Sequence, residues 1–383
     1  YIASLSKLLW LKDHRPQLYD AAHRVWPIAN FIMARMGVDD PPIDHATASF
    51  YGLLDTRKRQ WSTEIINLLE LDPVKFPALV PPGTQVGTLQ NTGAVQELGL
   101  AQGTPLVIGG GDQQCAALGS GMIEPGQGLI NLGTATAIMA AVQGPIRDYN
   151  QIIPSVCHAV PGQWEMEGHT QASGIILRRF RDEFAAAELA LASRLGLDPY
   201  TLLSEEASHS KPGAAGLVFL PTFNGTTAPI NYPHGSGVLL GMRVSHTRAD
   251  VLRAVMEGVC FENRWILEHM AISNAPVTSV YLSGGGSKSP LWCQIHADIL
   301  QRPITRVASS NTAAIGAAIC AGLGTGIYTS AEEGVITLSR TAETYEPNQD
   351  YQPLYAQHYD VFKAAYQTLY ESSLFDRLNE LIR

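Results

Sequence analysis

The apolar positions of this chain recur in two patterns, and each pattern predicts a different kind of element. Apolar residues at helical spacing predict helices over residues 5–11, 16–36, 62–71, 197–207, 247–270 and 354–382. The helix over 247–270 is the most clearly marked, because Thr247 and Asp250 three residues later form a start like a capping box. Short apolar runs bounded by turn residues predict strands over residues 106–108, 128–132, 135–142, 152–160 and 280–282.

One predicted strand leads directly into candidate chemistry. The run 106–108 ends in three glycines, where the backbone can turn sharply or approach a ligand, and Asp112 follows before a small-residue helix over 113–119. A carboxylate at the mouth of a strand lies where open α/β sheets bind their ligands, and a helix N-terminus stabilises its charge. A glycine turn followed by Asp is also a common helix N-cap, so this motif alone favours a functional and a structural interpretation equally.

Two further glycine turns follow predicted strands. Gly133 and Thr134 join two strands in a tight turn whose amides and hydroxyl suit a phosphate, although such a turn alone is more often only a hairpin. The segment 283–290, SGGGSKSP, lies between a strand and a helix over 291–300, an arrangement suited to a nucleotide or phosphate. It has neither the P-loop pattern nor the GxGxxG spacing. The prediction of a site therefore depends on the three turns occurring together.

Composition and charge argue against several classes of protein. A chain of 383 residues is long enough for two domains, and its net charge of −9 without a basic stripe argues against a nucleic-acid partner. No apolar run approaches the length of a membrane span. The five cysteines are scattered and never form a CxxC pair, which predicts reduced thiols in a cytoplasmic protein and indicates neither a zinc site nor disulfides. Because the chain starts at Tyr1 with an element-like stretch, we expect that its true beginning is missing.

Three sequence motifs, in the order in which they occur, resemble the FGGY family of carbohydrate kinases. They are GGGDQQCAALGSG, INLGTAT, and LSGGGSKSPLWCQIHADILQRPI followed by NTAAIGAAICAGLGTG. The resemblance covers essentially the whole chain and implies the actin-like ATPase architecture, in which two ribonuclease-H-like α/β domains close over a cleft. Residues 1–123 would be the C-terminal part of the first, sugar-binding domain. Residues 124–383 would be the second, ATP-binding domain with its C-terminal helix.

The resemblance also implies roles for particular residues. Asp112 matches the catalytic base, and Asp112 and Gln113 would contact the sugar. The residues implied in nucleotide binding are the phosphate turn Gly133 and Thr134, then Gly174, the adenosine turn Gly285, Gly286 and Ser289, and Gly316 in a small-residue helix. That helix must pack closely against either a neighbour or the ligand. ATP and Mg²⁺ are the implied cofactors, and no metal ligand is identified in this sequence.

Two departures from the family pattern affect these expectations. No DxGTxxxR hairpin, which would hold the other side of the phosphates and the Mg²⁺-linked acid, precedes Tyr1, and Asn311 stands where the family often has Glu. We therefore expect a first domain that is incomplete at its N-terminus.

The predicted function is the ATP-dependent phosphorylation of a sugar hydroxyl, with a ketopentose or polyol as substrate and xylulose as the default. A quorum-sensing autoinducer kinase and a glycerol-type kinase are alternatives within the family. A catalytically inactive nucleotide-binding fragment, or a truncated product without function, is the alternative outside it. The expected partner is a small-molecule sugar, with no nucleic acid and no membrane, and a homodimer is possible.

Overall fold

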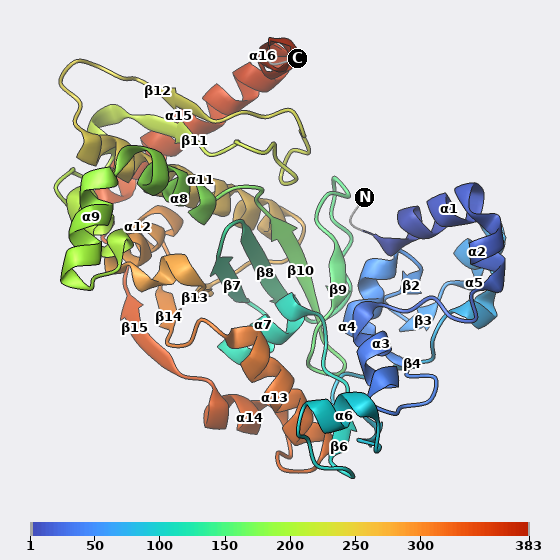
Figure 1. The fold of residues 1–383 in the computed structure, drawn as a ribbon. Helices are drawn as coiled ribbons and strands as arrows, with labels where there is room; N and C mark the ends of the chain where they lie inside the picture. Colours follow the sequence, from blue (N-terminus) through green and yellow to red (C-terminus); the bar gives the residue numbers. More distant parts are fainter. Residues whose placement is uncertain (1–2, 382–383) are drawn as a thin grey trace.

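The computed structural model describes residues 3–381, which form two parts of unequal size (Figure 1). The helices of the first part are α1 (Ser4–His14), α2 (Pro16–Ala21), α3 (Ile28–Arg35), α4 (His45–Ala48), α5 (Thr63–Leu68) and α6 (Gly93–Glu97). Its short strands pair two by two: β1 (Ile43–Asp44) with β4 (Leu79–Val80), β2 (Leu54–Asp55) with β3 (Gln60–Trp61), and β5 (Gln85–Thr88) with β6 (Pro105–Val107).

The second part is built on a seven-stranded mixed sheet. Its strand order is β15 (Thr341–Tyr345), β14 (Ile304–Val307), β13 (Ser279–Ser283), β7 (Gln127–Leu132), β8 (Thr136–Val142), β10 (Trp164–His169) and β9 (Ser155–Cys157). The strands β14, β13 and β7 are parallel, and the other pairs are antiparallel. A separate pair consists of β11 (Val218–Leu220) and β12 (Val238–Leu240).

Helices cover both faces of this sheet. The helices of the second part are α7 (Asp112–Ser120), α8 (Gly174–Phe184), α9 (Ala186–Leu195), α10 (Pro199–Ser208), α11 (Arg248–Ile272), α12 (Pro290–Leu300), α13 (Thr312–Gly324), α14 (Ala331–Leu338), α15 (Gln352–Glu371) and α16 (Leu374–Glu380). Alternate residues of a strand point to opposite faces. One face packs on α7 through Leu129, Ala137, Met139 and Ala141, and the other joins the main core with α11 through Ile130, Leu132, Ile138 and Ala140. Because β7 and β8 are covered on both sides, they are apolar almost without interruption.

The structure confirms the best-marked elements and corrects others. Helix α11 has the predicted capping box of Thr247 and Asp250. The single helix predicted over 16–36 is wrong. Pro27 lacks the N–H that a continuous helix needs at this position, and it disfavours helical backbone angles in the residue before it. It adopts an extended conformation as the N-cap of α3. The predicted C-terminal helix is likewise divided at Ser373, which has a positive φ.

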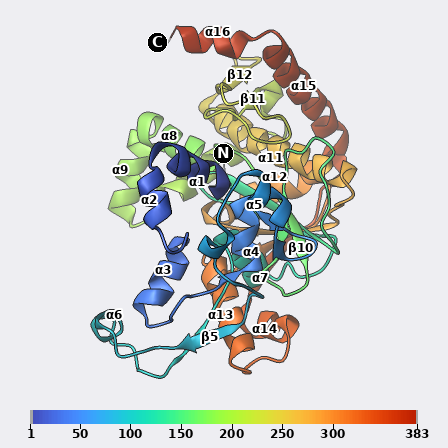
Figure 2. The ribbon, with the colours of Figure 1, turned by 90° about the vertical axis from the view of Figure 1, so that its right-hand side faces the viewer.

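The first part lies beside the β9 edge of the sheet. Figure 2, seen from the side of the first part, shows α4 and α5 in front of β10 and α7. Hydrogen bonds join the parts: for example, the Cys157 N–H donates to Ser49 Oγ at 3.0 Å, and Trp164 Nε1 donates to the Thr56 carbonyl at 2.9 Å. Within residues 3–381 no helix combines the length and apolarity needed to cross a membrane.

Candidate active site

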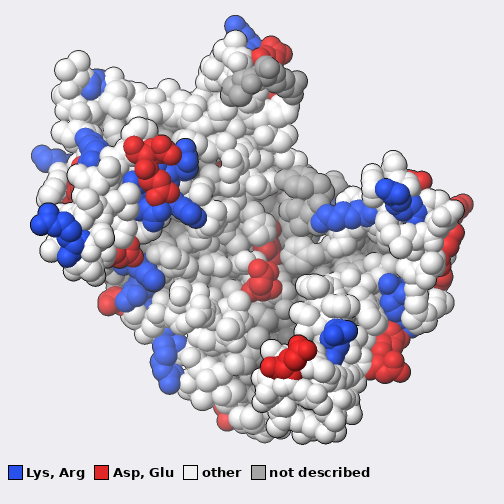
Figure 3. Space-filling view, viewed as in Figure 1, with Lys and Arg blue, Asp and Glu red and all other residues white. Residues whose placement is uncertain are grey.

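Asp112 begins α7 at the floor of a hollow between the two parts. The Cys115 N–H donates to the Gly111 carbonyl at 2.8 Å and closes the first helical turn. The Asp112 side chain is exposed, and its Oδ1 accepts a hydrogen bond from the Gln113 N–H at 3.0 Å. Figure 3 shows acidic atoms on the floor of this hollow, where α7 and β10 meet. The carboxylate is therefore accessible to a ligand that enters between the parts.

Gln113 ties this acid to the central sheet. Asn131 Nδ2 donates to Gln113 Oε1 at 3.2 Å, and the Asn131 carbonyl-type oxygen Oδ1 accepts from Ser283 Oγ at 3.3 Å. Asn131 lies on β7 and Ser283 on β13, so three elements meet at the start of α7. This network fixes the first helical turn, on which Asp112 stands.

A buried polar cluster lies directly under the same turn and was missed from the sequence. Gln114 Nε2 donates to Glu165 Oε1 at 3.0 Å and to Glu167 Oε2 at 2.6 Å. Each carboxylate also faces a histidine: His158 Nε2 lies 3.3 Å from Glu165 Oε2, and His169 Nε2 lies 2.8 Å from Glu167 Oε1. The available signal was the segment 164–169, WEMEGH, which places polar residues at alternate positions on one face of a strand.

The inner half of this cluster is uncharged at neutral pH. Burial raises the pKa of Glu165 well above its usual range, and the neighbouring Glu167 carboxylate raises it further. Burial also lowers the pKa of His158 to about 4. Glu165 is therefore the carboxyl of this cluster that holds a proton, while Glu167 faces the partly exposed His169.

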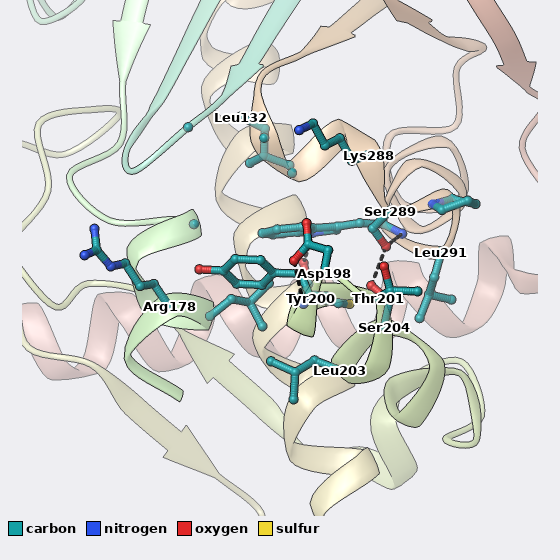
Figure 4. A pocket seen from close by; sticks show the side chains of 18 of the residues that line it. Leu132, Arg178, Asp198, Tyr200, Thr201, Leu203, Ser204, Lys288, Ser289 and Leu291 are labelled. Atoms are coloured by element: carbon teal, nitrogen blue, oxygen red, sulfur yellow. Dashed lines mark hydrogen bonds between the residues drawn. The ribbon is translucent and has the colours of Figure 1, made fainter. Parts of the chain in front are cut away.

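A second cavity, of about 730 Å³, lies across the end of the sheet (Figure 4). It brings together six residues that the sequence predicts for nucleotide binding: Gly133, Thr134, Gly174, Gly285, Gly286 and Ser289. Its volume is that of a small-molecule site, and backbone turns without bulky side chains form its inner wall. Such turns let backbone amides approach phosphates, so a nucleoside triphosphate fits the residues present.

The phosphate turn and the start of α8 form one rigid unit. The Gly174 N–H donates to the Gly133 carbonyl at 3.0 Å, and the N–H groups of Ser173 and Ile175 donate to the Thr134 carbonyl at 3.0 and 3.1 Å. A methyl group on Gly174 would overlap the Gly133 carbonyl oxygen, so only glycine allows this approach. The N-terminus of α8, which favours negative charge, thus stands beside the predicted phosphate turn.

Helix α10 supplies the opposite wall, which sequence reasoning did not find. Asp198, Tyr200 and Ser204 line the cavity and are labelled in Figure 4. Ser204 Oγ donates to Ser289 Oγ at 2.8 Å, a bond that joins α10 to the N-cap of α12. The sequence predicts this helix from its spacing, but no motif in it indicates which cavity the helix faces.

Gly316 is not among the residues that line this cavity. It lies on the face of α13 that packs against α7, where a side chain would overlap the Cys115 carbonyl. The small-residue helix was expected to pack against either a neighbouring element or the ligand, and in the structure it packs against α7. The structure thus places Gly316 in the contact between α13 and α7, and its role in nucleotide binding stays a prediction.

No group of three or more His, Cys, Asp or Glu side chains is placed to hold a metal ion in the part of the chain that the structure describes. Nucleotide-bound Mg²⁺ usually takes one or two carboxylates together with phosphate oxygens and water. Mg²⁺ stays a prediction, and no residue is assigned to it.

A cavity lined by glycine turns and an exposed carboxylate at the start of α7 are features that suit a phosphotransferase. Family models agree: the N-terminal domain of the FGGY family of carbohydrate kinases matches residues 1–119, and its C-terminal domain matches residues 128–325. The chain belongs to the FGGY family of carbohydrate kinases. Since the N-terminal domain is found in the chain, the expectation that a segment of it is lacking is not borne out.

Individual relatives carry several kinase names. Autoinducer-2 kinases of Escherichia coli K12 and Yersinia enterocolitica are 31% and 32% identical over 370 and 380 residues, covering 96% and 97% of this chain and 69% and 70% of theirs. The crystal structure of xylulose kinase from Rhodospirillum rubrum is 28% identical with a TM-score of 0.86, covering 98% of this chain and 73% of that one.

A more distant structure supports the fold. Plasmodium falciparum glycerol kinase with ADP has a TM-score of 0.83 at 18% identity, over 95% of this chain and 71% of that one. The actin-like ATPase architecture is confirmed by these structural matches.

Proposed function

We propose that this chain transfers the γ-phosphoryl group of ATP to a hydroxyl of a small sugar or polyol, with Asp112 as the general base. One observation carries the proposal. Asn131 binds Gln113, the neighbour of Asp112, and stands two residues before Gly133 of the phosphate turn. The candidate base and the candidate phosphate site therefore lie at the same end of β7.

The chain's own residues have a limited set of tasks in this reaction. ATP supplies the phosphoryl group when bound. Asp112 accepts the proton of the attacking hydroxyl, and its exposed position at the helix start leaves room for that hydroxyl. The backbone of Gly133 and Thr134 holds phosphate oxygens. The N–H dipoles stabilise their negative charge and so reduce its repulsion of the attacking hydroxyl oxygen. Phosphoryl transfer needs mostly such positioning and charge stabilisation.

For the acceptor we propose a short polyhydroxylated compound. D-xylulose is the default, and autoinducer-2 is the first alternative because the autoinducer-2 kinases are 31–32% identical over almost the whole chain. Glycerol is the second alternative. We further propose that the protein acts in the cytoplasm, and a homodimer also stays a prediction.

The test measures ADP release from ATP·Mg²⁺ with each of these three acceptors in turn, against the rate without acceptor. We expect one of them to raise the rate at least tenfold above that background. Calorimetry with ATP runs in parallel. ATP binding without transfer to any acceptor would instead support the alternative of a catalytically inactive nucleotide-binding protein. Failure to bind ATP would contradict the assignment of the cavity.

A further inference from the structure

Three residues form one row across the sheet at the start of α7. Asn131 on β7 pairs with Ala137 on β8, and Ala137 pairs with His169 on β10. Directly opposite residues of paired strands point to the same face, and this face is the one that packs on α7. With strands about 4.8 Å apart, the backbones of Asn131 and His169 are about 10 Å apart, and only the methyl group of Ala137 stands between them.

The first turn of α7 covers both ends of this row. Gln113 binds Asn131 at one end, and Gln114 binds Glu167, the partner of His169, at the other. Asp112 precedes these two glutamines at the exposed start of the helix. Ala137 itself is buried against α7, so the surface that stays open along this row belongs to Asn131 and His169.

The His169 ring is held in a defined orientation at the end of this row. Its Nε2 lies 2.8 Å from Glu167 Oε1, while the other carboxylate oxygen accepts from Gln114. Glu167 is buried, but 31% of the His169 side chain is exposed. Because Nε2 faces the carboxylate, Nδ1 is the ring nitrogen that is available to a ligand.

The inner pair of the cluster shows what a purely structural pair looks like here. His158 and Glu165 face each other in the same way, and both side chains are completely buried. The outer pair, Glu167 and His169, repeats this chemistry two residues further along β10, where the His169 side chain is partly exposed. Packing of the core alone does not require that the partly exposed ring of His169 be held in one orientation.

We propose that His169 is a specificity-determining residue that binds a hydroxyl oxygen of the acceptor through Nδ1, opposite Asn131 and beside Asp112. This inference rests on the proposed function. Glu167 and Gln114 are positioning residues, because they hold the ring and do not reach the acceptor themselves. The fitting ligand is a small molecule with at least two hydroxyl groups, one facing Asp112 and one facing His169.

The experiment compares acceptor kinetics of His169→Ala and His169→Gln with the wild type, using D-xylulose, glycerol and autoinducer-2 as probes. We expect His169→Ala to raise the acceptor KM about 10-fold to 100-fold, as for the loss of a hydrogen bond to a ligand, with the ATP KM within twofold. His169→Gln, which keeps a polar group of similar reach, should restore part of this loss.

Controls separate this role from stability and from the proposed function. His23→Ala, an exposed histidine between α2 and α3, should behave as the wild type. Glu167→Gln should raise the acceptor KM by a smaller factor, and its effect should vanish in the His169→Ala background, because both changes act on one contact. An acceptor KM within twofold of the wild type in His169→Ala would overturn the inference, whereas a wild type without any acceptor transfer would overturn the proposed function itself.

Discussion

Gly316 of α13 lies against the carbonyl of Cys115 in α7 so closely that any side chain at position 316 would overlap that oxygen. The contact is reciprocal, since a side chain on Gly119 of α7 would overlap the Thr312 carbonyl of α13. The two helices thus cross backbone to backbone, and α7 carries Asp112 at its start. The position of the candidate base depends on this crossing.

Gly316→Ala should therefore destabilise the protein and slow catalysis. Alanine gains about 1 kcal/mol in helix propensity, but forcing atoms into a filled contact costs about 1–3 kcal/mol and moves α7. We expect a lower midpoint of thermal unfolding and a lower kcat, with ATP affinity almost unchanged because Gly316 does not line the nucleotide cavity. Gly144→Ala is the matched control, since no atom lies within 4 Å of the added methyl group. Equal behaviour of the two variants would contradict this account.

Gly174→Ala should act on nucleotide binding instead. The methyl group would overlap the Gly133 carbonyl and push α8 away from the phosphate turn, breaking the 3.0 Å hydrogen bond from the Gly174 N–H. Loss of about 1.4 kcal/mol or more corresponds to at least tenfold weaker ATP binding, measurable by calorimetry. Gly144→Ala again serves as the control, and unchanged ATP affinity in Gly174→Ala would show that the turn is not part of the site.

The nucleotide cavity could largely be predicted from the sequence because its inner wall is made of turns. Gly133 and Gly285 each follow a predicted strand, so local patterns placed them at the ends of elements. The structure brings these ends together in one cavity. The residues that form a turn are neighbours in the sequence, so a turn can be recognised from one sequence alone.

The remaining parts of the site depend on contacts that no local pattern specifies. Glu165 and Glu167 alternate with apolar residues as on a strand with one solvated face, yet Gln114 from α7 covers that face. In the same way, spacing predicts a helix around Ser204 but not its bond to Ser289, 85 positions away. The sequence also left open whether the helix of Gly316 met a neighbour or a ligand. Tertiary packing decides each of these cases.

Asp112→Asn tests the candidate base with the least structural change. Asparagine has the same shape and still accepts the hydrogen bond from the Gln113 N–H, but it cannot take a proton from a hydroxyl. We expect kcat to fall by about 10² to 10⁴, while ATP affinity stays within twofold. Steady-state kinetics measures the change in kcat, and calorimetry measures the ATP affinity. Retention of more than a tenth of the wild-type kcat would exclude Asp112 as the base.

The bond between Ser204 and Ser289 should contribute modestly to nucleotide affinity. Ser204→Ala removes this 2.8 Å bond between α10 and α12, and the loss of about 0.5–1.5 kcal/mol predicts ATP binding about 2-fold to 10-fold weaker. Ser204→Thr keeps the hydroxyl and should bind nearly as the wild type. Ser289→Ala should in addition lower the free energy of unfolding, because Ser289 also accepts from the Trp292 N–H as the N-cap of α12. If Ser204→Thr binds as weakly as Ser204→Ala, the effect is steric and the hydrogen bond is not its cause.

Asp44 should make the stability of the first part depend on pH between 4 and 6. It caps α4 by accepting from the Thr47 N–H at 2.8 Å, and burial raises its pKa from 3.8 to about 6. The folded state thus holds a proton that the unfolded state has released. Its stabilising contribution is complete below pH 3.8 and is lost as the pH rises through 6.

Asp44→Asn keeps a capping oxygen but cannot ionise, so it should gain stability relative to the wild type as the pH rises. The difference in free energy of unfolding between variant and wild type should grow by about 2 kcal/mol from pH 4 to 6 and become level near pH 7. Urea unfolding at pH 4, 5, 6 and 7 measures this difference. Asp55→Asn is the control. The half-buried Asp55 carboxyl has a lowered pKa because the Lys58 N–H donates to it, so the stability difference between this variant and the wild type should change only below pH 4. A difference for Asp44→Asn that does not change between pH 4 and 6 would mean that Asp44 titrates as an exposed carboxyl and is not held in a dry environment.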